Sequence, residues 1–376
     1  MIKTAKIVLK KLIENGYEAY FVGGFVRDKL MGNVSSDIDI ATNARAEEVI
    51  NLFDKTILVG VKHGTVTVLL NKFQFEVTTF RTDGEYLDNR RPESVEFVQS
   101  IEEDLSRRDF TMNALALDYD DQLIDLFKGK EDIENGLIKC VGQPQKRFAE
   151  DGLRILRAIR FVSKLGFSID KPTYESMKYL KNNLSNIPVE RLKIELDKII
   201  KGTYKNKAFK ILHEMNTEAF SDINSCFSVP GNSIVDFDFV EFWAFAEIIQ
   251  EFNLDKWKLS KNQLKTIYYI KGGYEAIDEL TMLEVYKYGL TLLTSNKLRK
   301  LVSGDDFEQL ILNMYNKLPI KSKSDLLIDG YDIIELGFSK RKIGLILDDL
   351  EQSIVLGKLL NNKKDLTNYI RSKYND

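Results

Sequence analysis

The 376-residue sequence contains no apolar run of the roughly 18 residues that are needed to cross a membrane. Its first segment, MIKTAKIVLKKLIENG, also lacks the continuous apolar centre of a signal peptide. Apolar residues recur there at helical spacing between lysines, which predicts an amphipathic helix that Gly16 ends: Val8, Leu9, Leu12 and Ile13. We therefore expect a soluble, cytoplasmic protein with no membrane partner.

Cysteine, histidine and proline are scarce, with 2, 2 and 6 residues. Cys140 and Cys226 are far apart and neither has a CxxC partner, so the sequence predicts two buried thiols, with no disulfide framework and no zinc site. His63 and His213 share no spacing, and we expect neither to be catalytic. The net charge of -3 neither indicates nor excludes a nucleic-acid partner, because only the distribution of basic residues matters.

The residue pattern changes near residue 145. Before it, β-branched and aromatic runs, several of them alternating, predict strands: YEAYFVGG, SDIDIAT, TILVGVKHGTVTVLL and FQFEVTTF. After it, apolar residues recur at spacings of three and four, which predicts helices almost throughout. The fold class is therefore α+β, with a mixed-sheet region over residues 1–145 followed by an all-helical remainder.

Two aspartates separated by one residue stand out in the stretch SDIDIAT. In a strand, Asp37 and Asp39 would share a face, and two neighbouring carboxylates repel each other unless a cation lies between them. Hard oxygen ligands suit Mg²⁺ that also bridges substrate phosphates, the arrangement of metal-assisted nucleotidyl transfer. Glu76, in the next strand-like run, is the candidate third carboxylate. Taken alone, the pattern would favour a solvated strand face.

The residues just before this stretch favour the catalytic interpretation. Gly23 and Gly24 follow an apolar strand and would let a phosphate approach the backbone amides closely. Arg27, three residues on, could neutralise a triphosphate. A strand, a Gly-Gly pair, an arginine and then two aspartates would direct phosphate donors and metal ligands to one place.

These residues resemble a known signature. GGFVRD and SDIDIAT are similar to the head-domain motif of the class II tRNA nucleotidyltransferase and bacterial poly(A) polymerase family, within the polymerase-β-like superfamily. Further motifs match in order: HGTVTV, EVTTFR, DGEYLDNRRPESVEF, DLSRRDFTMNALA, EDGLRILRAIRF and VERLKIELDKII. Residues 328–359 resemble the family's tail, although Arg341 and Lys342 replace an expected Gly-Pro. The resemblance implies a head (1–145), neck (146–205), body (206–300) and tail (301–376).

The stretch EDGLRILRAIRF carries the predicted base-reading residues. On one helix, Asp151 and Arg154 would share a face and offer an acceptor beside a bidentate donor. That pairing suits cytosine and adenine, whereas uracil and guanine would turn a carbonyl toward the carboxylate. Arg157 and Arg160 continue the row and could hold sugar or phosphate. The alternative is a solvated helix with an internal salt bridge.

Two further motifs supply charged residues. In RRDFTMNAL, the family pattern places Arg108 at the nucleotide, while Arg107 and Asp109 could instead form a structural ion pair. In VERLKIELDKII, Arg191 and Glu195 lie at a spacing of four, which predicts a helix-stabilising pair. The polar segment 83–97 is predicted to be a mobile loop in which Arg90 and Arg91 contact nucleotide or only solvent.

The resemblance implies template-independent addition of CCA to the 3′ end of tRNA from CTP and ATP, with Mg²⁺ and release of pyrophosphate. Asp37 and Asp39 would hold the metal, and one of them or Glu76 would help to deprotonate the 3′ hydroxyl. The family loop, implied to help the pocket switch from CTP to ATP, argues that A addition is retained. Two alternatives stay open: an A-adding enzyme that acts after a separate CC-adding enzyme, or a non-catalytic nucleotide- or RNA-binding module.

Overall fold

The computed structural model describes residues 1–35, 37–58, 64–83, 95–228, 237–250 and 254–374. It forms two compact units, Met1–Val235 and Asp236–Asp376. This division falls inside the predicted body, so the boundaries proposed for head, neck, body and tail stay predictions. Arg90, Arg91 and His63 lie outside the described residues.

The head contains a mixed seven-stranded sheet, as predicted. Its strand order is β3-β4-β5-β2-β1-β8-β9, and β2 and β5 are parallel while the other neighbours are antiparallel. The strands are β1 (Ala19–Val22), β2 (Asp39–Thr42), β3 (Thr56–Ile57), β4 (Thr65–Leu70), β5 (Phe73–Thr79), β8 (Ala116–Leu117) and β9 (Leu123–Ile124). A separate hairpin, β6 (Arg81–Asp83) and β7 (Val95–Phe97), flanks the predicted loop.

Alternation along the strands explains how the sheet is held. In β5, Phe75 and Val77 are fully buried, whereas Glu76 between them is exposed. Fully burying a side chain of this size contributes about 1.5–3 kcal/mol. Because the two apolar neighbours fix the strand's register, Glu76 must point to the opposite face.

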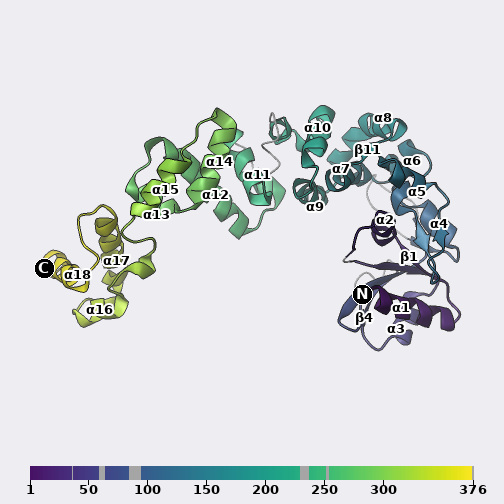
Figure 1. The fold of residues 1–376 in the computed structure, drawn as a ribbon, viewed down its shortest axis with the longest axis horizontal. Helices are drawn as coiled ribbons and strands as arrows, with labels where there is room; N and C mark the ends of the chain where they lie inside the picture. The colour runs from purple at the N-terminus through teal and green to yellow at the C-terminus, as the bar shows by residue number, and fades with distance from the viewer. Residues whose placement is uncertain (36, 59–63, 84–94, 229–236, 251–253, 375–376) are drawn as a thin grey trace. The chain divides into compact units, whose positions relative to one another are not determined.

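Short helices surround this sheet. α1 (Ile2–Glu14) ends two residues before Gly16, whose φ of +86° lets the chain turn back. α1 and α3 (Ala46–Leu52) lie side by side against the sheet (Figure 1). The remaining head helices are α2 (Gly24–Leu30), α4 (Ile101–Ser106) and α5 (Gly129–Glu134).

The rest of the first unit is nearly all helical. The long helix at Leu153–Leu165 (α7) packs against α9 and α10, and its Ile155 and Ile159 are fully buried. The predicted all-helical neck nevertheless contains one short strand, β11 (Ser168–Ile169), which pairs with β10 (Leu137–Ile138). The helices are α6 (Pro144–Glu150), α7 (Leu153–Leu165), α8 (Lys171–Leu180), α9 (Val189–Ile200) and α10 (Lys205–Met215).

The second unit is helical and has an apolar interior. Trp243 and Trp257 are fully buried, with ring centroids 5.0 Å apart. Its helices are α11 (Phe239–Ile249), α12 (Lys261–Ala276), α13 (Met282–Tyr288), α14 (Thr291–Ser303), α15 (Glu308–Lys317), α16 (Gly330–Glu335), α17 (Lys340–Val355) and α18 (Lys363–Tyr374). In the described parts of the chain, no helix is long and apolar enough to cross a membrane. Cys140 and Cys226 are buried free thiols, as predicted.

Candidate active site

One large pocket in the first unit is lined by residues of the head and of the neck. Its volume is about 1130 Å³, above the roughly 300–1,000 Å³ typical of a site for one small ligand. Its lining contains every site residue predicted from the sequence: Gly23, Gly24, Arg27, Asp37, Asp39, Glu76, Arg108, Asp151, Arg154, Arg157 and Arg160. The pocket therefore has room for a nucleotide together with a second reactant.

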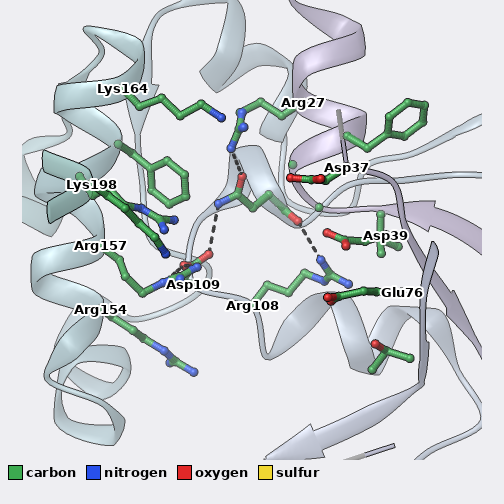
Figure 2. Close-up of a pocket in the computed structure, with 18 of the residues that line it drawn as sticks. Arg27, Asp37, Asp39, Glu76, Arg108, Asp109, Arg154, Arg157, Lys164 and Lys198 are labelled. Carbon is green, nitrogen blue, oxygen red and sulfur yellow. Dashed lines mark hydrogen bonds and ion pairs between the residues drawn. The ribbon is translucent and has the colours of Figure 1, made fainter. Parts of the chain in front are cut away.

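The three predicted acids lie together on the head side of this pocket (Figure 2). Asp39 is the first residue of β2, and the parallel register places it beside Glu76 of β5. Asp37 precedes the strand, and its backbone carbonyl accepts a hydrogen bond of 2.8 Å from Ser35 Oγ. The prediction that one strand carries both aspartates is therefore only half right, because the strand begins at Asp39.

The carboxyl group of Asp39 lacks an adequate positive neighbour. Burial, and next the charge of Glu76, raise its pKa from 3.8 to about 6, against the opposing effect of Arg108. A cation between the acids would relieve this cost, so the donor set fits a hard divalent ion. The described residues include no ready cluster of three or more His, Cys, Asp or Glu side chains for a metal.

Gly23 lies close to both Arg108 and Asp39 in the pocket lining. Its φ is +68°, a conformation that other residues rarely adopt, and it precedes the first turn of α2. A Cβ atom added here would lie 3.2 Å from Arg108 Nη1 and 3.5 Å from Asp39 Oδ2. A glycine is therefore needed to let the backbone approach both groups.

Arg108 is held by a residue that the sequence reasoning missed. Asp104 of α4 is 1% exposed and pairs with Arg107 at 2.8 Å and with Arg108 at 2.9 Å. Burial alone would raise the pKa of Asp104, but the two arginines outweigh burial and lower it. Asp104 precedes the two arginines by three and four residues, and this spacing could have indicated the two ion pairs.

Arg27 is also hydrogen-bonded to neighbouring side chains of the protein. It is 2% exposed, and its guanidinium donates to Asp28 Oδ1 and to Asn113 Oδ1, each at 2.7 Å. Its guanidinium also lies 5.4 Å from the centre of the Phe161 ring. Arg27 thus lies in the pocket wall with a fixed orientation. No pattern in the sequence had indicated that Asn113 and Phe161 contact it.

The predicted base-reading pair has a different geometry from the one expected. α6 ends at Glu150 and α7 begins at Leu153, so Asp151 and Arg154 do not share one helix face. Asp151 Oδ1 accepts from the backbone amide of Leu153 at 3.0 Å, which explains the break, because aspartate readily bonds the amide two residues on. The i,i+3 prediction is therefore wrong, although both side chains still line the pocket.

Each member of that pair has its own partner of opposite charge. Arg191 of α9 donates to Asp151 Oδ2 at 2.9 Å, and Arg154 donates to Glu150 at 2.7 Å. The spacing of four residues predicts a pair between Arg191 and Glu195. That prediction is wrong, because Arg191 bonds Asp151 and Glu195 lies 3.2 Å from Arg160. The helices α6, α7 and α9 are thus joined by ion pairs around the pocket.

Buried Asp109 of the head pairs with Arg157 of α7, whose side chain is one third exposed. Arg157 Nε donates to Asp109 Oδ2 at 2.7 Å. Arg107 instead pairs with Asp104, unlike the Arg107–Asp109 ion pair considered from the sequence. Burial would raise the pKa of Asp109, but Arg157 outweighs it and lowers that pKa to about 2. Arg160 stacks 4.5 Å from the Phe161 ring centre, and burial lowers its pKa.

The chain is similar to known nucleotidyltransferases. Family models match the poly A polymerase head domain at residues 19–139, the probable RNA and SrmB-binding site of polymerase A at 166–217, and tRNA nucleotidyltransferase domain 2 at 244–370. The chain belongs to the family of CCA-adding enzymes, which confirms the resemblance inferred from its motifs.

Relatives match over almost the whole chain. The CCA-adding enzyme of Ligilactobacillus salivarius is 38% identical, over 97% of this chain and 95% of its own length. That of Bacillus subtilis is 37% identical, over 97% and 96%. A crystal structure of the Bacillus stearothermophilus CCA-adding enzyme in complex with CTP superposes with a TM-score of 0.83 at 33% identity, covering 100% of this chain and 98% of that one.

Proposed function

We propose that the protein adds CCA to the 3′ ends of tRNA, taking CMP from CTP and AMP from ATP without a nucleic-acid template. One observation carries the proposal beyond family membership: a single pocket has carboxylates on its head side and paired acids and arginines on its neck side. The first set suits phosphoryl chemistry, and the second suits reading a base edge. A protein that reads the incoming base with its own side chains needs no template strand.

In the proposed reaction, the tRNA 3′ oxygen attacks the α-phosphorus of the nucleotide and pyrophosphate leaves. Asp37 and Asp39 would hold Mg²⁺, which when bound would favour the ionised hydroxyl and neutralise phosphate charge. Asp39 or its neighbour Glu76 would take the hydroxyl proton. Gly23 and Gly24 would leave the backbone open to the phosphates, and Arg108, fixed by Asp104, would neutralise their charge.

The base would be chosen on the neck side. Asp151 would accept from the exocyclic amine of cytosine or adenine, and Arg154 would donate to the adjacent ring acceptor. Arg191 and Glu150 keep the two side chains in place through the ion pairs seen in the structure. Uracil and guanine would present a carbonyl to Asp151, at a cost on the order of 1–3 kcal/mol for each contact. Arg27, Arg157 and Arg160 would contact sugar or phosphate from the pocket wall.

The proposed partners are tRNA, CTP and ATP in the cytoplasm, with no requirement for zinc. The test is to incubate the purified protein and Mg²⁺ with a tRNA that ends at the discriminator base, and to resolve the products at single-nucleotide resolution. CTP alone should add two residues, and CTP with ATP should add CCA. Addition of A only to tRNA that already ends in CC would establish the A-adding alternative, and no transfer to any tRNA end would favour the binding module.

A further inference from the structure

Arg147 of α6 connects the neck to the head through three groups. Its Nε donates to the carbonyl of Val141 at 3.1 Å, its Nη1 donates to Glu150 at 2.9 Å, and its Nη2 donates to the carbonyl of Ser106. The side chain is 17% exposed. Arg147 is not among the residues that line the pocket.

The same network includes the proposed base reader Arg154. Glu150 Oε2 accepts from Arg147 at 2.9 Å and from Arg154 at 2.7 Å, so one carboxylate oxygen fixes both guanidinium groups. Arg154 Nη1 also lies 3.4 Å from the carbonyl of Arg147. Glu150 compensates both positive charges, so the positions of the two arginines are linked through this one carboxylate.

On the head side, both neck arginines reach the end of α4. Arg147 donates to the carbonyl of Ser106 and Arg154 donates to that of Arg107, where a helix leaves its last carbonyls without intrahelical partners. The same short helix carries Asp104, which fixes Arg108 next to Gly23 and Asp39. The last turn of α4 is therefore bonded to residues of both sides of the pocket.

We propose that Arg147 is a positioning residue for nucleotide choice: it sets the place of Arg154 relative to the phosphate and metal side of the pocket. The proposal rests on the proposed function, because it needs Arg154 to read the base. Arg147 ties Glu150 to the head through the carbonyl of Ser106. Without Arg147, Glu150 and the Arg154 side chain bonded to it would be less restrained relative to the head. Discrimination between cytosine and uracil would then weaken, while Asp37, Asp39 and Glu76, which Arg147 does not bond, would keep their places.

The test is Arg147→Gln, with kcat and KM measured separately for CTP and for UTP on a tRNA that lacks CCA. We expect the CTP-to-UTP ratio of kcat/KM to fall about tenfold, mainly through a higher KM for CTP. Arg147→Lys keeps the charge but cannot direct donors to all three acceptors at once, so its ratio should be intermediate. Combining Arg147→Gln with Glu150→Gln should cost less selectivity than the sum of the single changes.

Arg299→Gln is the matched control, because the Arg299 side chain of the second unit is 15% exposed, close to the 17% of Arg147, and is paired with an acid, Asp278. It should leave the CTP-to-UTP ratio unchanged. An unchanged ratio in Arg147→Gln, with only a lower melting temperature, would overturn the proposal by showing a purely structural role. If the wild-type protein adds no nucleotide to tRNA, the proposed function itself fails, which is a distinct result.

Discussion

The two sides of the pocket handle charge in opposite ways. On the head side, Asp39 and Glu76 are neighbouring acids, and the pKa of Asp39 is raised to about 6. On the neck side, acids meet arginines, and the pKa of Asp109 beside Arg157 is lowered to about 2. The acids beside Arg154 and Arg157 are therefore neutralised by those arginines, whereas Asp39 and Glu76 repel each other, and a bound cation would relieve that repulsion.

This difference indicates that the neck side of the pocket is the pre-organised part of the site. Paired side chains on the neck side have few orientations open to them, which suits the recognition of a base edge. Unpaired acids on the head side store a cost that a metal and a nucleotide would relieve on binding. Substitutions on the two sides should therefore differ in whether they affect the rate or the stability.

The largest effect is expected for Asp39→Asn. Removing this carboxylate should lower the rate of nucleotide addition more than about a hundredfold, because the proposed metal loses a ligand. It should leave the melting temperature unchanged or slightly higher, because a repulsive buried charge is gone. Single-turnover addition and thermal unfolding check both parts. A variant with near wild-type rate would contradict the assignment of the head side.

The next effect is expected for Asp109→Asn, on stability. Arg157 would be left without its partner, which should lower the free energy of unfolding by about 3 kcal/mol, at the low end of such costs because a third of the Arg157 side chain is exposed. Denaturant unfolding measures this change. Adding Arg157→Gln should recover part of the loss, and strict additivity of the two changes would argue that the pair is not coupled.

The same pair makes stability depend on pH. The folded-state pKa of Asp109 is below its ordinary value of 3.8, so its contribution is present above about pH 4 and is lost as the pH falls toward 2. The stability difference between wild type and Asp109→Asn should shrink by roughly 2 kcal/mol between pH 5 and pH 2. A difference that stays constant over this range would show that the carboxylate is not what stabilises Arg157.

The smallest effect is expected at the surface of the neck. Lys171 and Glu175 form an exposed pair at 3.9 Å on α8, away from the pocket lining. Lys171→Ala should change the free energy of unfolding by less than about 0.5 kcal/mol and leave nucleotide addition unchanged. A larger loss, measured by the same denaturant titration, would mean that charge pairing on the neck matters irrespective of burial.

The sequence was a better guide to the head side than to the neck side for a physical reason. Strand alternation and a glycine turn are local patterns, so the strand around Glu76 and the turn at Gly23 could be predicted from their neighbours. The break between α6 and α7, in contrast, coincides with a single side-chain hydrogen bond, which no repeating pattern indicates. The bond from the Leu153 amide to Asp151 moved that residue off the helix expected to carry Arg154.

Partners far apart in sequence could not be predicted at all. Asn113 bonds Arg27 across 86 residues, and Arg191 bonds Asp151 across 40 residues. No spacing rule relates such positions, because they are brought together only by the packing of head, α7 and α9. The sequence therefore indicated a set of charged residues and glycines that line one pocket, but it indicated neither their partners nor pocket residues such as Asn113.

The most direct measurement compares C and U addition by wild type, Asp39→Asn and Asp151→Asn in single-turnover assays on the same tRNA. If the head side performs transfer and the neck side chooses the base, Asp39→Asn should slow addition from either nucleotide. Asp151→Asn should instead narrow the preference for CTP over UTP by about tenfold or more. A full preference for CTP in Asp151→Asn, or an unchanged rate in Asp39→Asn, would contradict this division between the two sides of the pocket.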